Sequence, residues 1–329
     1  MKVSVVIVTF NSKLEDIIRT LETVLCQDFC DYEIIISDDG SKENYFEYLR
    51  KYFCMKSFSN YVLVENKENQ GTVRNVLEGL SRASGEYVKT FGPGDGFYDT
   101  KSLGVYYDFL NTNNYSFCFS YMQGYTRDKE KICKEFHGVP RDISAYQKDD
   151  EKLILKNLIL YSDFVCGASM FSEASKYKEY LLKIKDYVKY CEDLFQVFAA
   201  IEGERFHLLP EYAIWYEMGT GVSSKKNTKY EGLLYKDTLN FYDKLIEQHE
   251  NNKYVKKRGK LDWLYKRFSN IYVKTLIRTL FNPEAILIVL KSFVQRVFRK
   301  DKINDKIGFF DQDEFNSKVD GIIETLRNI

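Results

Sequence analysis

Four short segments that are mostly β-branched or aliphatic alternate with helical stretches over the first hundred residues. They are Val3–Phe10, Tyr32–Ser37, Tyr61–Glu65 and Glu86–Phe91. The first is apolar almost throughout, which is typical of a central parallel strand covered on both faces. Strands separated by helices of about 12–15 residues form βαβ units. The sequence therefore predicts an α/β fold with a mostly parallel sheet, and Ser12–Glu15 (Ser-Lys-Leu-Glu) predicts a capping box at the first helix.

The pattern becomes looser beyond Gly96. We predict strands at Tyr115–Met122, Val165–Phe171 and Phe206–Tyr216, helices at Asp99–Leu110 and Tyr190–Ile201, and a polar, irregular surface insertion at Arg127–Lys148. No strand pattern is visible after Lys225, and residues 230–329 have helical patterns. We therefore predict two regions, an α/β domain over 1–224 and a helical, basic region over 225–329.

Composition excludes several classes of protein. Hydrophobic residues make up 44% of the 329 positions, which is enough to bury a core and excludes wholesale disorder. The seven cysteines are odd in number and form no Cys-x-x-Cys pair, so neither a disulfide framework nor a zinc site is expected. The N-terminus has no signal-peptide pattern, and the longest apolar run, Ala285–Leu290, is far too short to span a membrane. We therefore expect a cytoplasmic protein.

The formal net charge is zero, but the charges are unevenly distributed along the chain. Residues 251–300 contain 13 basic and two acidic side chains, an excess that the other residues balance. The neutral total does not favour nucleic-acid binding, and no nucleic-acid-binding motif is present. In Leu261–Phe281 and Ala285–Phe298, basic side chains are interspersed among apolar ones at helical spacing, which is typical of helices on anionic membranes. The alternative is a helical region packed on the rest of the chain, with its charges in solvent.

Ligands of open parallel sheets bind beyond the carboxyl ends of the strands, so the residues there are the candidates for a site. The turn after the first strand has no glycine and no Walker A pattern occurs, which excludes a dinucleotide fingerprint and a P-loop. What remains is the ring of Phe10 beside the carboxylates of Asp38 and Asp39. The ring can stack on a base, and a carboxylate can accept a base N–H or a ribose hydroxyl. Alternatively, Asp38–Ser41 forms only a turn and a helix cap.

Three motifs stand at strand ends in a fixed order. They are Ser4–Asn11 (Ser-Val-Val-Ile-Val-Thr-Phe-Asn), Glu33–Ser41 (Glu-Ile-Ile-Ile-Ser-Asp-Asp-Gly-Ser) and Asn69–Asn75 (Asn-Gln-Gly-Thr-Val-Arg-Asn). Together they resemble the motifs of the inverting family 2 of nucleotide-sugar glycosyltransferases, which have the GT-A fold. The resemblance implies a GT-A nucleotide-sugar transferase domain over 1–224 and a helical C-terminal extension over 225–329.

The resemblance also implies a donor site at the strand ends. The implied donor-binding residues are Thr9, Phe10, Asn11, Asp38, Asp39, Arg74 and Asp95. Phe10 would lie on the base between Thr9 and Asn11. Asp38 or Asp39 would bind the uracil or the ribose. Arg74, one turn into a helix, would reach the nucleotide, and its alternative role is that of an exposed helical arginine.

The motif after the fourth strand departs from the family pattern. Family members carry Asp-x-Asp-Asp there, whereas Gly92 and Gly94 stand at the first two Asp positions of this chain and only Asp95 remains. The resemblance implies a divalent metal, Mg²⁺ or Mn²⁺, which Asp95 would hold together with phosphate oxygens and waters. The two glycines weaken that expectation. The alternative is a Pro-Gly turn in which Asp95 caps the helix that begins near Asp99.

An inverting transfer also needs a carboxylate that removes the proton of the acceptor hydroxyl. The resemblance places it in a Glu-Asp pair before a helix, which is Glu192-Asp193 in this chain. We expect Asp193 to be the general base, with Glu192 in reserve. Two acids in a first helical turn also interact favourably with the helix dipole, which is the alternative role.

The segment Trp215–Ser224 ends a predicted strand with two glycines and precedes a lysine. The resemblance implies a loop here that closes over the diphosphate through Gly219, Gly221 and Lys225, since amides and a cation suit a leaving group that gains negative charge. An ordinary flexible linker is the alternative.

The predicted function is that of an inverting hexosyltransferase. It would move a sugar from a UDP-sugar to a hydroxyl of a glycan or lipid-linked acceptor in bacterial surface polysaccharide synthesis. Residues 251–300 would hold it at the inner face of the cell membrane as a peripheral protein. The alternative, which Gly92 and Gly94 favour, is a catalytically impaired GT-A domain that acts as a membrane-associated scaffold in a polysaccharide assembly complex. The donor sugar, the acceptor linkage and the oligomeric state are not predicted.

Overall fold

The computed structural model of the chain describes residues 1–128, 131–136, 140–219, 221, 228–268, 270, 272–273, 276, 280–298 and 312–328. Over these ranges a nine-stranded sheet has the order β3-β2-β1-β4-β8-β6-β9-β5, and β7 pairs with β6. The strands are β1 (Val3–Thr9), β2 (Tyr32–Asp38), β3 (Tyr61–Glu65), β4 (Tyr87–Phe91), β5 (Gly96–Phe97), β6 (Phe117–Asp128), β7 (Lys131–Phe136), β8 (Met170–Glu173) and β9 (His207–Glu217).

Helices connect and cover these strands. They are α1 (Leu14–Leu25), α2 (Phe46–Met55), α3 (Thr72–Arg82), α4 (Ser102–Asn113), α5 (Ile143–Gln147), α6 (Glu151–Tyr161), α7 (Ala174–Ile184), α8 (Phe195–Ile201), α9 (Thr228–Gln248), α10 (Lys253–Lys266), α12 (Glu284–Phe298) and α13 (Gln312–Asn328), with 3₁₀ turns η1 (Gly167–Ser169) and η2 (Glu192–Leu194).

The predicted parallel strands are present in the first half of the sheet. β1 pairs in parallel with both β2 and β4, and β2 pairs in parallel with β3. The register sets Thr9 beside Asp38 and Asp38 beside Glu65, so the carboxyl ends of three strands meet at one edge. Because β8 is antiparallel to β4 and to β6, the sheet as a whole is mixed.

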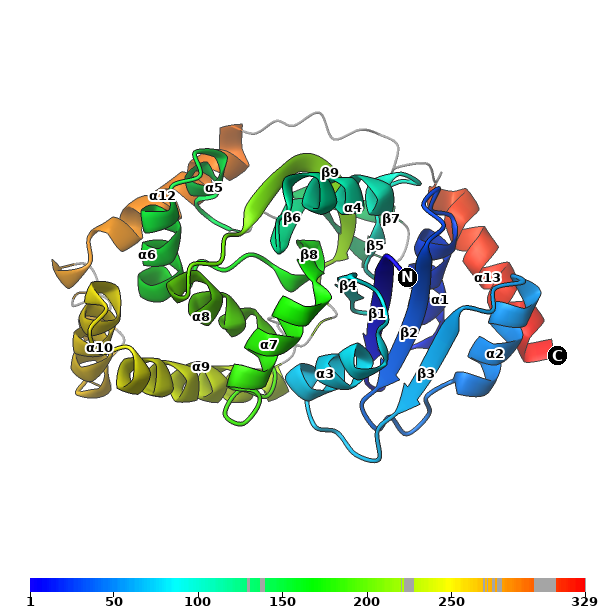
Figure 1. Cartoon of the computed structure of the whole chain (residues 1–329), viewed down its shortest axis with the longest axis horizontal. Coiled ribbons are helices and arrows are strands. Elements are labelled where there is room, and N and C mark those ends of the chain that lie inside the picture. The colour runs from blue at the N-terminus through cyan, green and yellow to red at the C-terminus, as the bar shows by residue number, and fades with distance from the viewer. Residues whose placement is uncertain are drawn as a thin grey trace.

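Apolar side chains of the central strands alternate between two cores on opposite faces of the sheet. Val6 and Ile35 belong to the core that α3, α6, α7 and α8 cover. Their neighbours Val5 and Ile34 belong to the core under α1, α2 and α4. This alternation is what the two-residue period of a strand requires when both faces are covered (Figure 1).

The last helix returns to the N-terminal part of the sheet. In Figure 1, α13 lies beside α1 and α2, whereas α10 and α12 lie at the opposite end of the molecule. Arg19 Nη1 donates to Asn316 Oδ1 (2.7 Å), and Lys318 Nζ lies 2.8 Å from the buried Glu22 carboxylate. α13 is therefore one of the helices through which the helical region is attached to the sheet domain.

The predicted capping box at the first helix is wrong. Lys13 occupies the N-cap position of α1 and makes no capping hydrogen bond through its side chain. Ser12 Oγ instead accepts a hydrogen bond from the backbone N–H of Phe10 (3.3 Å). The hydroxyl therefore stabilises the turn that follows β1. A serine hydroxyl can accept either a backbone N–H of such a turn or one at the start of a helix, and here it accepts the first.

Three other segments differ from the sequence-based expectations. The region 127–148, predicted to be irregular, contains β7 and α5. Residues 167–169, predicted to be strand, form the 3₁₀ turn η1, so that β8 begins only at Met170. The helix predicted over 190–201 begins as the 3₁₀ turn η2 and continues as α8. β7 exists because it pairs with β6, and such a tertiary contact leaves little local signal.

Candidate active site

Asp38 organises the turn at the end of β2. Its buried carboxylate accepts hydrogen bonds from Thr9 Oγ1 (2.8 Å), from the backbone N–H of Ser41 (2.8 Å) and from Ser41 Oγ (2.6 Å). The hydroxyl on β1 and the turn after β2 are thus joined through one side chain. The turn suggested as an alternative role for Asp38–Ser41 is present, and it fixes the strand edge where a nucleotide site is predicted.

Asp39 joins the same edge to the start of α3. Its two carboxylate oxygens accept the backbone N–H groups of Gln70 and Gly71, each at 2.8 Å. Burial raises the pKa of Asp39 above its ordinary value, and these two backbone hydrogen bonds act in the opposite direction. The second and third motifs of the sequence are therefore in direct contact.

The other predicted donor-binding residues lie around this turn. Phe10 is half-buried, and Asn11 is exposed in the left-handed backbone region, with φ 47°. The backbone N–H of Asn11 donates to Ser41 Oγ (2.7 Å), which places Phe10 and Asn11 beside the Asp38 turn. Arg74 forms an ion pair with Asp186 through Nη2 and Oδ1 (2.9 Å). Binding of a nucleotide by these residues stays a prediction.

Asp95 is buried after β4, and β9 supplies its hydrogen-bond donor. The backbone N–H of Glu217 donates to Asp95 Oδ1 (2.8 Å). Gly94 has φ +97°, and a Cβ at this position would lie 1.9 Å from Glu217 Oε2. A Cβ at Gly92 would meet only Asp95 Oδ2, at 3.7 Å. The side chain of Glu217 thus occupies the space that a residue other than glycine would need at position 94.

Lys89 lies in β4 and is fully buried near these carboxylates. Its ammonium donates to the carbonyl oxygens of Thr90 and Ala168, both at 2.7 Å. Burial lowers the pKa of Lys89 to about 7, whereas the charge of Asp95 acts to raise it. Burial likewise raises the pKa of Asp95 to about 7, and the charge of Lys89 opposes that shift. Each group therefore favours the charged form of the other.

Glu192 and Asp193 lie in η2 against the loop that precedes β8. A Cβ at Gly167 would be 3.0 Å from Asp193 Oδ1 and 3.5 Å from Glu192 Oε1, so both carboxylates approach this glycine closely. Burial and the neighbouring charge of Glu192 raise the pKa of Asp193 well above that of an ordinary aspartate. Burial also raises the pKa of Glu192. The pair is consequently a better proton acceptor than two solvated carboxylates would be.

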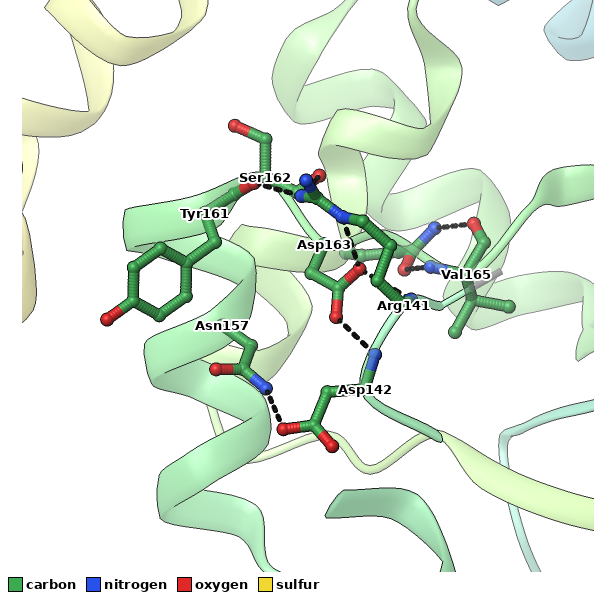
Figure 2. Close-up of polar contacts among 8 residues, drawn as sticks. Arg141, Asp142, Asn157, Tyr161, Ser162, Asp163 and Val165 are labelled. Carbon is green, nitrogen blue, oxygen red and sulfur yellow. Dashed lines mark hydrogen bonds and ion pairs between the residues drawn. The ribbon is translucent and has the colours of Figure 1, made fainter. Parts of the chain in front are cut away.

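The loop before β8 is fixed at its start by buried polar contacts, which Figure 2 shows. The Asp163 carboxylate accepts the backbone N–H of Arg141 (2.8 Å) and of Asp142 (3.1 Å), and Arg141 Nε lies 3.2 Å from Asp163 Oδ1. Further along, the backbone N–H of Val165 donates to Oε1 of Gln196 on α8 (3.0 Å). Nε2 of Gln196 donates in turn to the carbonyl oxygen of Val165 (2.7 Å). The loop that faces Asp193 is therefore joined to the helix that follows Asp193.

Two adjacent residues of this loop bring the predicted metal ligand and the predicted base into one neighbourhood. Gly167 contacts Asp193, and the carbonyl of Ala168 accepts the Lys89 ammonium that interacts with Asp95. The charges of both Asp95 and Asp193 also act on the Cys166 thiol, whose pKa burial raises. Two carboxylates 98 residues apart in the sequence thus both lie near the segment 166–168.

Comparison with known proteins identifies the family. Residues 4–175 match the family described as Glycosyl transferase family 2, which is more than half of the chain. The chain belongs to this family. The resemblance stated from the three strand-end motifs is confirmed.

Curated relatives of this chain include two that are named for one acceptor. It is 26% identical to the poly(ribitol-phosphate) beta-glucosyltransferase of Bacillus spizizenii over 249 residues, which are 74% of this chain and 35% of the relative. It is 28% identical to the poly(ribitol-phosphate) beta-N-acetylglucosaminyltransferase TarP of Staphylococcus aureus over 274 residues, 80% of this chain and 78% of the relative. The chain thus spans about a third of the Bacillus protein's length.

Solved structures show the same fold. The crystal structure of S. aureus TarS 1-349 in complex with UDP-GlcNAc has a TM-score of 0.52 and 17% identity, covering 75% of this chain and 67% of that one. The complex with UDP has a TM-score of 0.52 and 15% identity, covering 100% and 92%. The predicted GT-A fold with a helical C-terminal region is confirmed.

The loop predicted to close over the diphosphate is described in part. Gly219 has φ +94°, and a Cβ at Gly219 or at Gly221 would meet no atom of the described residues within 4 Å. Lys225 lies outside the described residues. The role of this loop stays a prediction.

Two residues of this candidate site, Glu217 and Lys89, were not predicted from the sequence. Glu217 is 122 residues beyond Asp95, and nothing in the sequence near either residue indicates their contact. Lys89 stands in a strand that otherwise reads as buried, and a lysine in that position was a usable signal, because a lysine is almost never fully buried unless it has partners.

Proposed function

We propose that this chain is an inverting glycosyltransferase that moves a sugar from a UDP-sugar to a hydroxyl of a glycan or lipid-linked acceptor. Poly(ribitol phosphate) is the acceptor class that the names of two relatives favour. The observation that carries the proposal is the segment 166–168, in which Gly167 lies close to Asp193 and the carbonyl of Ala168 accepts the ammonium of Lys89, whose pKa the charge of Asp95 raises. A base for the acceptor and a carboxylate for the donor thus share one site.

Asp193 supplies the base in this mechanism. Its carboxylate accepts the proton of the acceptor hydroxyl while that oxygen attacks the anomeric carbon of the donor. The new carbon–oxygen bond forms opposite the leaving group, and the bond to UDP breaks with its electron pair remaining on the diphosphate. The close contact with Gly167 limits the positions that the carboxylate can adopt, which favours a fixed geometry of attack.

The residues after β4 fit the divalent metal that the family generally uses. Over the described ranges, no group of three or more His, Cys, Asp or Glu side chains is arranged to hold a metal ion. Mg²⁺ does not require such a group, because one or two carboxylates with phosphate oxygens and waters suffice. Asp95 offers one carboxylate, and Glu217, at the place of a side chain on Gly94, offers a second. A bound metal would neutralise charge that develops on the diphosphate.

The test of the proposed function is release of UDP from a panel of UDP-sugars, with and without poly(ribitol phosphate). We expect one donor, with UDP-glucose and UDP-GlcNAc as the first candidates, to release UDP at a rate that the acceptor increases. Release from no donor, with or without acceptor and Mn²⁺, would contradict the proposal and favour the scaffold alternative.

We also propose that the helical region binds an anionic membrane surface and holds the enzyme at the inner face of the cell membrane. Among the described helices, none is both long and apolar enough to span a membrane. Large apolar side chains along the segment 276–294 are nevertheless at least 42% exposed: Leu276, Leu280, Phe281, Ile286, Leu287, Val289, Leu290, Phe293 and Val294. The 13 basic residues of 251–300 favour an anionic partner, because cytoplasmic leaflets have a negative surface potential.

Contacts on the other side of α12 hold this apolar surface in place. Ala285 and Ile288 are buried in the core. Glu284 at the start of the helix accepts the Tyr161 hydroxyl (2.7 Å) and pairs with Lys156 (2.6 Å), both on α6. One face of α12 is therefore attached to the enzyme, and the exposed face is available to a lipid surface.

Flotation with vesicles tests the membrane proposal. Wild-type protein is expected to float with vesicles that contain phosphatidylglycerol and not with neutral phosphatidylcholine vesicles. Leu290→Glu with Phe293→Glu is expected to reduce the floated fraction at least about tenfold, since it removes apolar contact and adds negative charge. Leu182→Glu, at an apolar side chain of α7 that is also exposed, is the matched control. Equal flotation of both variants would contradict the proposal.

A further inference from the structure

A buried aspartate of α9 holds the segment that leads into the acid pair. Asp237 Oδ2 accepts three consecutive backbone N–H groups, those of Lys189 (2.9 Å), Tyr190 (2.5 Å) and Cys191 (3.1 Å). Glu192 and Asp193 follow immediately in the chain. One carboxylate oxygen therefore sets the direction of the backbone just before the predicted base.

The other side of this segment contacts the start of α3. The carbonyl of Lys189 accepts the backbone N–H of Val73 (3.1 Å), which is one of the amides that a helix N-terminus leaves unpaired. Just before Val73 in the chain, the backbone N–H groups of Gln70 and Gly71 donate to the carboxylate of Asp39. The segment 189–191 thus lies between the start of α3 and α9, and it is hydrogen-bonded to both.

The chemistry of Asp237 suits positioning. The side chain is buried, and burying a carboxylate is costly unless hydrogen bonds satisfy the charge. Three amides do so here, and amide bonds to an ionised carboxylate are stronger than those between neutral groups. Tyr190 and Tyr230 also contact each other, with ring centroids 5.4 Å apart, which ties the same segment to α9 a second time.

We propose that Asp237 is the positioning residue of the Glu192–Asp193 pair. This inference rests on the proposed function, because it concerns how the base of that reaction is placed. Asp237 does not touch the substrate. It fixes the backbone of 189–191, and α9, which lies beyond the residues that match the family, thereby completes the active site.

The electrostatic surroundings of the pair give a readout that a purely structural role would not change. Burial raises the pKa of Glu192, and the charge of Asp237 adds to that rise. The other groups around the pair are Cys191 just before it in the chain, Cys166 and Gly167 on the loop before β8, and Tyr177 on α7. Replacing Asp237 by asparagine removes the charge on α9 and leaves the other groups in place.

The experiment compares Asp237→Ala and Asp237→Asn with Asp243→Asn, an exposed carboxylate on the same helix. Asp237→Ala is expected to lower kcat about 100-fold, as a misplaced catalytic group does, with the Kd for UDP changed less than twofold. Asp237→Asn is expected to lower kcat less and to move the acid limb of the pH profile to higher pH, because the pKa of Glu192 falls and the charge of Glu192 in turn raises the pKa of Asp193. Asp243→Asn is expected to change neither kcat nor the acid limb of the pH profile.

Several outcomes would overturn the inference. The inference is wrong if Asp237→Asn has wild-type kcat and an unmoved acid limb of the pH profile. This variant decides the question if Asp237→Ala does not fold. An equal loss of UDP affinity and kcat would indicate general disruption and would also overturn it. If the wild-type protein transfers no sugar, the proposed function fails instead, and if Asp193→Asn remains active, only the assignment of the base fails, so that these failures are distinguished.

Discussion

Asp193→Asn is expected to lower kcat by about 10³- to 10⁴-fold, the upper range of what a positioned general base contributes. Asparagine has nearly the same shape but cannot accept the proton of the acceptor hydroxyl at neutral pH. The Kd for UDP is expected to stay within about twofold of wild type, because the predicted donor-binding residues Asp38 and Asp39 lie at the carboxyl end of β2 and not in η2. Single-turnover transfer and calorimetric titration with UDP measure the two quantities separately.

The pH dependence of the wild-type enzyme follows from the same residue. Burial and the charge of Glu192 raise the pKa of Asp193, so that lowering the pH protonates the base and removes activity. We expect kcat to rise with pH over a range above the one in which an ordinary aspartate titrates. Glu192→Gln removes the neighbouring charge, lowers the pKa of Asp193 and moves this limb to lower pH.

A control and a contradicting result complete this prediction. Asp108→Asn, at an exposed carboxylate of α4, is expected to leave kcat unchanged. If Asp193→Asn keeps more than a tenth of wild-type kcat, the assignment of the base is wrong.

Asp95→Asn is expected to weaken UDP binding in the presence of Mn²⁺ by about 10- to 100-fold, the range in which altered metal-site residues act. Asparagine retains an oxygen that can accept the backbone N–H of Glu217 and loses the charge that a metal would use. In EDTA, the Kd for UDP is expected to be the same for variant and wild type. Calorimetric titration of UDP under both conditions measures the effect.

Glu217→Gln is expected to weaken Mn²⁺-dependent binding in the same direction, because its carboxylate stands where a side chain on Gly94 would lie. Glu211→Gln, at an exposed position of the same strand, is the matched control. An Mn²⁺-dependent Kd for UDP that is unchanged in both Asp95→Asn and Glu217→Gln would contradict the metal proposal.

The early strands and their order along the chain could be predicted because each is set by local pattern. The segment Tyr61–Glu65 forms β3 with the predicted bounds, and the other three early strands agree to within one residue at each end. β1, β2 and β4 are buried at nearly every position, and the edge strand β3 is flanked by turn residues, so a short window of sequence is sufficient. The strand-end position of Asp38 and Asp39 follows from the same reasoning.

The candidate site could be predicted only where its residues belong to recognisable motifs. Glu217 reaches Asp95 from β9, and Asp237 reaches the 189–191 segment from α9, through contacts that no local pattern encodes. Ser12 illustrates the opposite error, since its sequence pattern suits a helix cap while its hydroxyl serves the turn after β1. Tertiary contacts decide each of these cases.

The stereochemistry of a single transfer tests the central claim most directly. The measurement is proton NMR of the glycosidic linkage formed from an α-linked UDP-sugar on poly(ribitol phosphate) by the wild-type enzyme. An inverting reaction with Asp193 as base predicts a β linkage in the first product detected. An α linkage would contradict this account.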